Sequence, residues 1–96
     1  MPAKFLPVAL LLALPTLALA GPPESGQKLF TIYCARCHGR DGRLGANGAH
    51  DLTQSNLNAE GRTYLVTNGL GKMPGFKSEL TPAEVQRVVD YSLTLK

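Results

Sequence analysis

The chain has 96 residues, ten Lys and Arg against seven Asp and Glu, a formal net charge of +3, two cysteines and no tryptophan. This length allows one small domain at most and excludes a large multidomain enzyme. The charge is too small to identify a partner by itself, and we expect protein partners and no nucleic acid.

The first twenty residues are typical of an export signal. Lys4 precedes an almost continuous apolar run over residues 5–20, which ends in the small-x-small pattern Ala18-Leu19-Ala20. The run contains two prolines and is shorter than the ~20 residues that a membrane-spanning helix needs. We therefore expect residues 1–20 to be a cleaved signal peptide and residues 21–96 to be the exported domain, located in the periplasm without an integral membrane anchor.

Apolar residues at helical spacing predict a first helix at about residues 24–36. Gly26 lies on the same face as Phe30. Glycine inside a helix costs up to about 1 kcal/mol relative to alanine, and the usual reason to accept this cost is a close crossing by another helix. The following segment, residues 39–58, is glycine-rich and has no sustained period, which predicts a long loop that wraps something or has a function.

Two more helices are predicted downstream. Residues 59–68 indicate a short helix with Tyr64, Leu65 and Val66 facing inward, ended by Asn68-Gly69 as a C-cap. The segment Thr81-Pro82-Ala83-Glu84 combines an N-cap, a proline at the first helical position and a capping-box glutamate. The last helix then presents one apolar face, made by Val85, Val88, Val89, Ser92 and Leu95. Because no alternating strand pattern of useful length is present, the predicted fold class is all-α.

The motif Cys34-Ala35-Arg36-Cys37-His38 carries the chemistry, because C-x-x-C-H is the attachment signature of c-type haem. Cysteines three residues apart lie on one side of a helical turn, so both sulfurs can reach the two vinyl groups on one porphyrin edge. The histidine that follows then lies beneath the iron. We expect one covalent haem c, bound through Cys34 and Cys37, with His38 as the proximal iron ligand. The ring would also supply an interior that so small a domain lacks.

Two other roles of the cysteines are less favoured. A zinc site would need Cys34, Cys37, His38 and His50, yet the neighbours Cys37 and His38 cannot readily point at one tetrahedral ion. A thioredoxin-like redox pair would require a βαβ setting, which the predicted helices do not provide.

The chain resembles the small monohaem class I cytochromes c, especially the soluble bacterial and photosynthetic types with a short methionine loop. Four stretches carry the resemblance: Gly26-x-x-x-Phe30, CARCHG at 34–39, VTNGLGKMPGF at 66–76 and LTPAEVQRVVDY at 80–91. The resemblance implies a class I cytochrome c fold, with three to four helices wrapped around one covalently bound haem. It also implies that the first and last helices cross, where Gly26 and Phe30 would meet Tyr91.

The same resemblance assigns a role to Met73, the only methionine besides Met1. It implies that Met73 is the distal iron ligand, delivered by a loop that its glycines and Pro74 allow to curl over the ring. A thioether is a soft ligand, and His/Met ligation raises the reduction potential of a haem. A gap-filling role for Met73, and His50 as a second axial ligand, are the alternatives.

Several polar residues are weaker candidates for the surroundings of the haem. Family members often use a proline carbonyl to accept the Nδ1 proton of the proximal histidine, but no proline lies between residues 24 and 73. We expect a carbonyl around residues 45–47 to take that role. Asn56 or Asn58 could hydrogen-bond the Met73 sulfur or a propionate. The candidates for binding the propionates are Arg40, Arg43 and Arg62.

An iron with both axial positions filled by protein cannot readily bind a substrate, so its natural work is moving one electron. We therefore expect a monomeric periplasmic electron carrier, not an enzyme, that exchanges electrons with respiratory or dehydrogenase partners. An acidic partner could be steered to the haem edge by Lys28, Arg36, Arg40, Lys72 and Lys77. The alternatives are a dedicated haem subunit of a periplasmic redox enzyme, and a haem with a displaceable Met73 that acts in ligand binding or peroxide chemistry.

Overall fold

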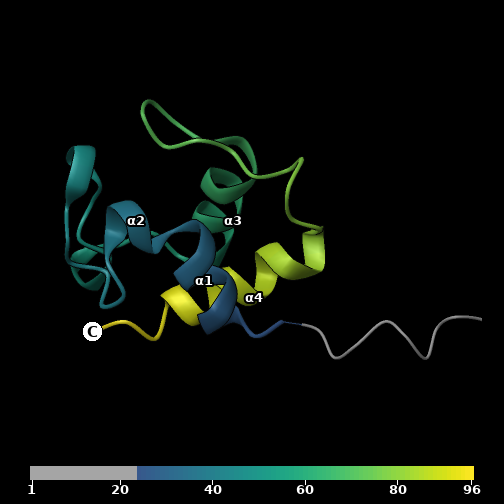
Figure 1. Cartoon of the computed structure of the whole chain (residues 1–96), viewed down its shortest axis with the longest axis horizontal. Helices are drawn as coiled ribbons and strands as arrows, with labels where there is room; N and C mark the ends of the chain where they lie inside the picture. The colour runs from purple at the N-terminus through teal and green to yellow at the C-terminus, as the bar shows by residue number, and fades with distance from the viewer. Residues whose placement is uncertain (1–23) are drawn as a thin grey trace, which may run out of the picture.

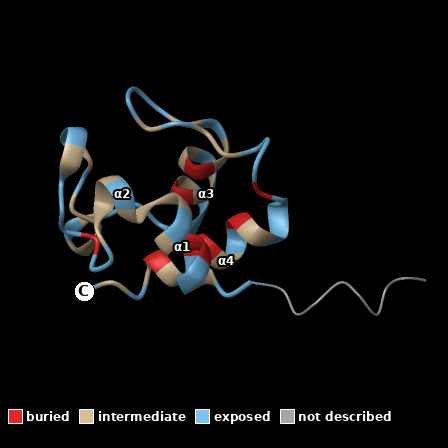
Figure 2. Ribbon diagram, viewed as in Figure 1, coloured by how far each residue is buried: buried red, intermediate tan, exposed pale blue. Residues whose placement is uncertain are grey.

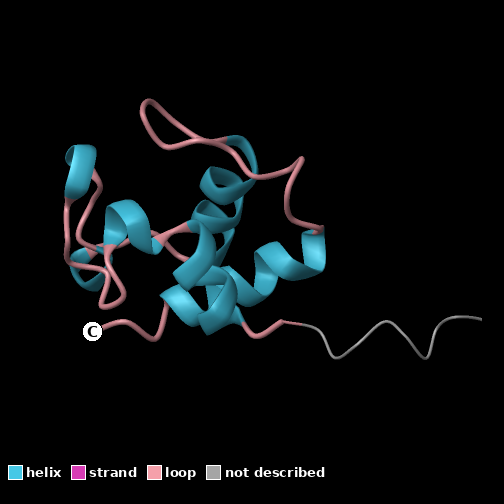
Figure 3. Ribbon diagram, viewed as in Figure 1, coloured by secondary structure: helices cyan, strands magenta, loops and turns pink. Residues whose placement is uncertain are grey.

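The computed structural model describes residues 24–96, so the predicted signal peptide lies outside the described residues. Helices joined by loops make up this part of the chain (Figure 3). In chain order they are α1 (Gly26–Tyr33), α2 (Ala35–His38), the short 3-10 helices η2 (Ala46–Gly48) and η3 (Leu52–Gln54), α3 (Ala59–Asn68) and α4 (Pro82–Ser92). Within residues 24–96 the only β pairing is an isolated bridge between Leu70 and Met73, so the all-α prediction is confirmed.

The predicted first helix is divided in two at Cys34. α1 begins after Ser25, whose hydroxyl accepts a hydrogen bond from the Lys28 N–H at 3.1 Å. At Cys34 the backbone φ of −118° departs from helical values, although its N–H still donates to the Phe30 carbonyl at 2.8 Å. α2 then starts at Ala35. The motif residues are therefore delivered by a separate helical turn that follows directly from α1.

α1 and α4 cross closely at Gly26 (Figure 1). A β-carbon at this position would lie 2.8 Å from the carbonyl carbon of Arg87, and nearer still to its oxygen. One turn later the rings of Phe30 and Tyr91 pack with their centroids 5.4 Å apart and tilted by 58°. The predicted crossing of the first and last helices is thus confirmed, and it explains the glycine inside α1.

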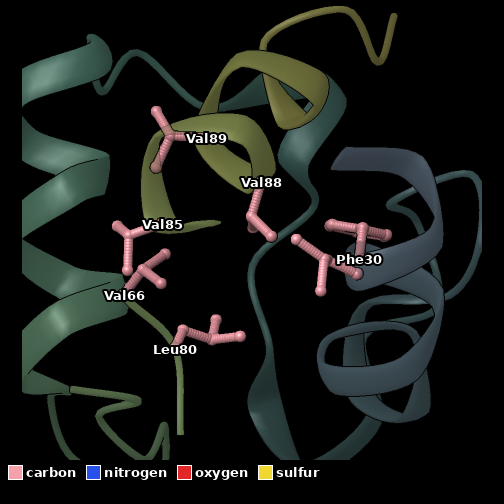
Figure 4. Close-up of a cluster of buried hydrophobic side chains, with 7 residues drawn as sticks. Phe30, Val66, Leu80, Val85, Val88 and Val89 are labelled. Carbon is pink, nitrogen blue, oxygen red and sulfur yellow. The ribbon is translucent and has the colours of Figure 1, made fainter. Parts of the chain in front are cut away.

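The apolar core lies between α1, α3 and α4, together with Leu80 just before α4 (Figure 2; Figure 4). Its buried members are Leu29, Phe30, Val66, Leu80, Val85, Val88 and Val89. By contrast, Gly42 is the only buried residue over the whole stretch 35–61, which contains α2, η2 and η3. That stretch follows a defined path without an apolar core of its own.

α4 has the predicted start and the predicted inward face. The Thr81 N–H donates to the Glu84 carboxylate at 2.8 Å, and the Glu84 N–H donates to the Thr81 hydroxyl at 3.2 Å, which completes the capping box. Val85, Val88, Val89 and Ser92 are buried as expected, while Leu95 lies beyond the end of the helix and is half-buried.

α3 has the predicted bounds, and its predicted inward face is confirmed at Val66, partly at the half-buried Leu65 and not at Tyr64. Tyr64 was expected to point inward, yet it is 64% exposed. The buried side chains are Arg62 and Val66, which lie four residues apart on one face of the helix. Tyr64 falls midway between them in sequence and therefore on the opposite side. The helix buries an arginine where the sequence favoured a tyrosine.

The α1–α4 crossing predicts a selective effect of alanine at Gly26. Gly26→Ala should lower the free energy of unfolding by about 1–3 kcal/mol, because the added methyl group overlaps the α4 backbone, which cannot move aside as a side chain can. Gly61→Ala is the matched control, since its β-carbon meets the flexible tip of Leu57 and should change stability by less than about 1 kcal/mol. Denaturant unfolding followed by circular dichroism measures both; equal effects would contradict a close backbone crossing.

Candidate haem site

The two cysteines of the motif lie around the α1–α2 junction. Cys34 is the residue between the helices and Cys37 is in α2, and both are free, half-buried thiols. Burial raises the pKa of the Cys34 thiol to about 12, so it is neutral at pH 7. The Asn47 side-chain nitrogen lies 3.8 Å from the Cys37 sulfur. Both sulfurs are thus presented by one turn of chain.

His38 ends α2 and is oriented by a backbone carbonyl. Its Nδ1 lies 3.1 Å from the carbonyl oxygen of His50, and because a carbonyl can only accept, Nδ1 carries the proton. The expectation that residues 45–47 would supply this acceptor is wrong: the chain turns through η2 first and returns to His38 at residue 50. Desolvation by burial lowers the pKa of His38, which favours the neutral imidazole. Nε2 is left with a free lone pair, as a metal-binding histidine requires.

The alternatives that use His50 or zinc find no support in the geometry. The carbonyl contact places His50 beside His38, whereas a second axial ligand must approach from the opposite side of the ring. Among residues 24–96 no group of three or more His, Cys, Asp and Glu side chains is arranged to hold a metal ion. A four-ligand zinc site is therefore not formed by Cys34, Cys37, His38 and His50.

Met73 is held at the end of a tight backbone turn. Leu70 and Met73 exchange two N–H···O=C hydrogen bonds, each of 3.0 Å, across the two-residue turn Gly71-Lys72. Gly71 has a φ of +60°, which favours glycine at the first position of such a turn. The arms of the turn also touch closely: a β-carbon on Gly69 would lie 2.5 Å from the Gly75 nitrogen. The sequence prediction that these glycines shape the loop agrees with the observed backbone.

The Met73 loop is anchored to α3 and to α1. The Phe76 N–H donates to the Val66 carbonyl at 2.8 Å, which joins the return of the loop to α3. The Phe76 ring packs edge-on against Tyr33, with centroids 5.8 Å apart and planes at 72°. Met73 itself is half-buried and packs against the apolar core. Because Tyr33 precedes Cys34, this aromatic contact ties the methionine loop to the cysteine motif.

The burial pattern of the surrounding segments fits an apolar ring. Leu44, Leu57 and Leu70 are 60%, 45% and 72% exposed, although they belong to the loops that flank the motif and Met73. Residues 35–61 bury no apolar side chain of their own, as described above. A flat apolar macrocycle held by Cys34 and Cys37 would give these segments an interior to pack against. Two thiols, an imidazole nitrogen with a free lone pair and a thioether are the donor types that a c-type haem takes.

Most of the residues proposed to bind the haem propionates or the Met73 sulfur have protein partners of their own. Asn58 caps α3, because its side-chain oxygen accepts the Gly61 N–H at 2.9 Å. Arg43 donates to the Lys96 carbonyl at 2.9 Å, and Arg40 is exposed. Arg62 is buried and donates to backbone and hydroxyl oxygens. No sequence pattern indicates the role of the His50 carbonyl or the burial of Arg62.

Known proteins with similar sequences and structures are c-type cytochromes and a cytochrome oxidase subunit. Residues 21–91 match the family model described as cytochrome c oxidase, cbb3-type, subunit III. Cytochrome c6 of Rippkaea orientalis is 38% identical over 82 residues, which cover 79% of this chain and 73% of that protein. Cytochrome c6 of Leptolyngbya boryana is 39% identical over 75 residues, 72% of this chain and 87% of that one. The solved structure of the KustC0563 c-type cytochrome is 28% identical with a TM-score of 0.70, covering 76% of this chain and 99% of that chain.

The chain therefore belongs to the class I c-type cytochromes, as the sequence motifs indicated. Membership implies one covalently bound haem c and a role in electron transfer. Each helix within residues 24–96 is too short or too polar to cross a lipid bilayer.

The packing of the methionine loop predicts different effects of two glycine substitutions. Gly69→Ala should disturb the Met73 turn and lower the free energy of unfolding by more than about 2 kcal/mol, since its methyl group would strike the backbone of the other arm. Gly71→Ala is the matched control: its φ is also positive, but its β-carbon would point into open space, so only about 1 kcal/mol of backbone strain is expected. Thermal unfolding and the visible spectrum of the holoprotein measure both, and a larger effect at Gly71 would refute the packed loop.

Proposed function

We propose that this cytochrome is a periplasmic one-electron carrier whose haem is attached through Cys34 and Cys37 and ligated by His38 and Met73. The proposal includes removal of residues 1–20 as a signal peptide and export of residues 21–96 as the cytochrome domain. The observation that carries it is the 3.1 Å contact between His38 Nδ1 and the His50 carbonyl, because it leaves Nε2 as the only ring nitrogen able to bind iron.

The axial residues are supported in ways that suit electron transfer. The haem supplies a single-electron iron couple when bound. The hydrogen bond to His50 fixes the imidazole of His38, and the two backbone bonds between Leu70 and Met73 fix the thioether loop. A site whose proximal imidazole and whose methionine loop are both held by backbone hydrogen bonds changes shape little with oxidation state. It also denies the iron to water and small ligands, which argues against peroxide or gas chemistry.

Charge on the surface favours an acidic redox partner. The segments that carry the proposed ligands, residues 26–40 and 61–78, contain no Asp or Glu. They present five exposed basic side chains: Lys28, Arg36, Arg40, Lys72 and Lys77. Lys28 is already paired with Glu24 at 3.1 Å, so the other four are the better candidates for steering.

A second function, as the haem subunit of a terminal oxidase or another redox complex, is favoured by the matching family model and by one relative. The cbb3-type cytochrome c oxidase subunit CcoP of Rubrivivax gelatinosus is 36% identical over 91 residues, although these cover only 29% of that protein. The chain thus spans about a third of that relative. A freely diffusing carrier and a bound subunit would use the same haem site and differ in what surrounds it.

Replacing Met73 tests the proposed axial ligand. Met73→Ala should leave the haem covalently attached, lower the reduction potential by roughly 0.1 V or more and allow carbon monoxide to bind the ferrous iron. Ser78→Ala, at an exposed position that follows the same loop, is the control and should keep the wild-type spectrum. Visible spectroscopy, redox titration and carbon monoxide binding give the readouts; an unchanged potential in Met73→Ala would remove Met73 from the iron.

Fractionation of a periplasmic extract separates the two functions. A free carrier should elute from a size-exclusion column at physiological salt as a small monomer, detected by its haem absorbance. Co-elution with a large oxidase or dehydrogenase from the same column would instead support the subunit role. Absence of the haem protein from the periplasmic extract, with its recovery in the cytoplasmic fraction of the same cells, would contradict the periplasmic assignment.

A further inference from the structure

Arg62 is a charged side chain in the interior of the domain. It is 8% exposed and makes three hydrogen bonds: Nε donates to the Leu57 carbonyl at 2.9 Å, and Nη1 donates to the Ser92 carbonyl at 3.1 Å and to the Ser92 hydroxyl at 3.0 Å. The Ser92 hydroxyl in turn donates a hydrogen bond to the Val89 carbonyl at 2.7 Å. Every acceptor in this network is electrically neutral.

No carboxylate of the protein neutralises this guanidinium. All seven Asp and Glu residues lie within residues 24–96, and the one ion pair in that range joins Lys28 to Glu24. Burial lowers the pKa of Arg62, but an arginine remains charged in a protein at any ordinary pH. An unpaired buried charge is destabilising unless something in its surroundings compensates. The carbonyl end of α4 gives partial compensation, because its dipole is negative there.

A buried cation acts on the redox equilibrium of a haem in the same small domain. A domain of this size has a radius of gyration of roughly 11 Å, which sets the scale of the separation between two groups inside it. The ferrous state carries one more electron than the ferric state and is favoured by a nearby positive charge. At an effective dielectric constant of about 20, one charge at about 11 Å changes the equilibrium constant roughly tenfold.

We propose that Arg62 is a redox-tuning residue, whose buried positive charge raises the reduction potential of the haem. Its three hydrogen bonds hold the guanidinium inside the domain, because they connect it to Leu57 before α3 and to Ser92 at the end of α4. Arg62 acts through the field and not through contact with iron, so it is a positioning residue of the electron-transfer site. The proposal rests on the bound haem c of the family and is independent of which side chains ligate the iron.

The test is a redox titration of holoprotein variants at low and high salt. Arg62→Leu combined with Ser92→Val replaces the polar pair with apolar side chains and should lower the potential by about 59 mV, the equivalent of a tenfold change. Arg62→Lys retains the charge and should keep most of the potential. Because a buried charge is poorly screened, the shift of the double variant should persist at high salt.

Two controls separate the field from a structural role. Ser92→Ala keeps the guanidinium but loses one acceptor, so it should lower stability while leaving the potential unchanged. Arg87→Gln removes a half-buried arginine of α4 that also donates to a backbone carbonyl, that of Glu24 at 2.8 Å. Its effect on the potential should be smaller and should decline as salt is added.

The outcomes distinguish an effect of the Arg62 charge on the reduction potential from a purely structural role of this residue. A double variant with the wild-type potential would overturn the proposal, as would Ser92→Ala if it lowered the potential as far as the double variant does. If the double variant does not fold, the comparison between Arg62→Gln and Arg62→Lys decides, because only the former loses the charge. The visible spectrum of each variant reports the axial ligands separately, so an error in the Met73 assignment would already be seen in the wild type.

Discussion

The contact between α1 and α4 at Gly26 positions everything else in this cytochrome. It allows two backbones to approach closely, so that the Phe30 and Tyr91 rings make a tilted contact beside the crossing. The buried valines of α4 then complete the core with α3. α1 runs directly into Cys34, and α3 runs directly into the Met73 loop. The two halves of the proposed iron site are therefore held at fixed positions by one small helical core.

Residues 35–61 lie outside this helical core and depend on the haem for an apolar interior. Residues 35–61 bury only Gly42, yet they supply His38, its acceptor carbonyl at His50 and the exposed Leu44 and Leu57. A covalently held ring explains why a chain this short can dispense with an apolar core on that side. Cofactor and polypeptide are then two parts of the same fold, since each covers surface that the other would expose.

Sequence patterns predicted the parts of this structure that rest on local chemistry. The capping box at Thr81 and Glu84, the glycine crossing and the turn around Met73 each involve neighbouring residues with a clear conformational preference. The acceptor for His38 could not be predicted, because the loop before it has no period and its path depends on distant contacts. Arg62 was missed as an interior residue for a related reason: α3 has no apolar stripe, and its partner Ser92 lies thirty residues away.

The central claim is that the Met73 sulfur and His38 ligate the iron from opposite faces of the ring. Met73 is the one methionine of residues 21–96, so a protein labelled with carbon-13 at the methionine methyl gives a single resonance from this part of the chain. In the ferrous holoprotein, proton NMR should show that methyl group shifted far upfield by the ring current of the haem directly beneath it. A methyl resonance at the position of an ordinary half-buried methionine would contradict the assignment and leave the distal face without its proposed ligand.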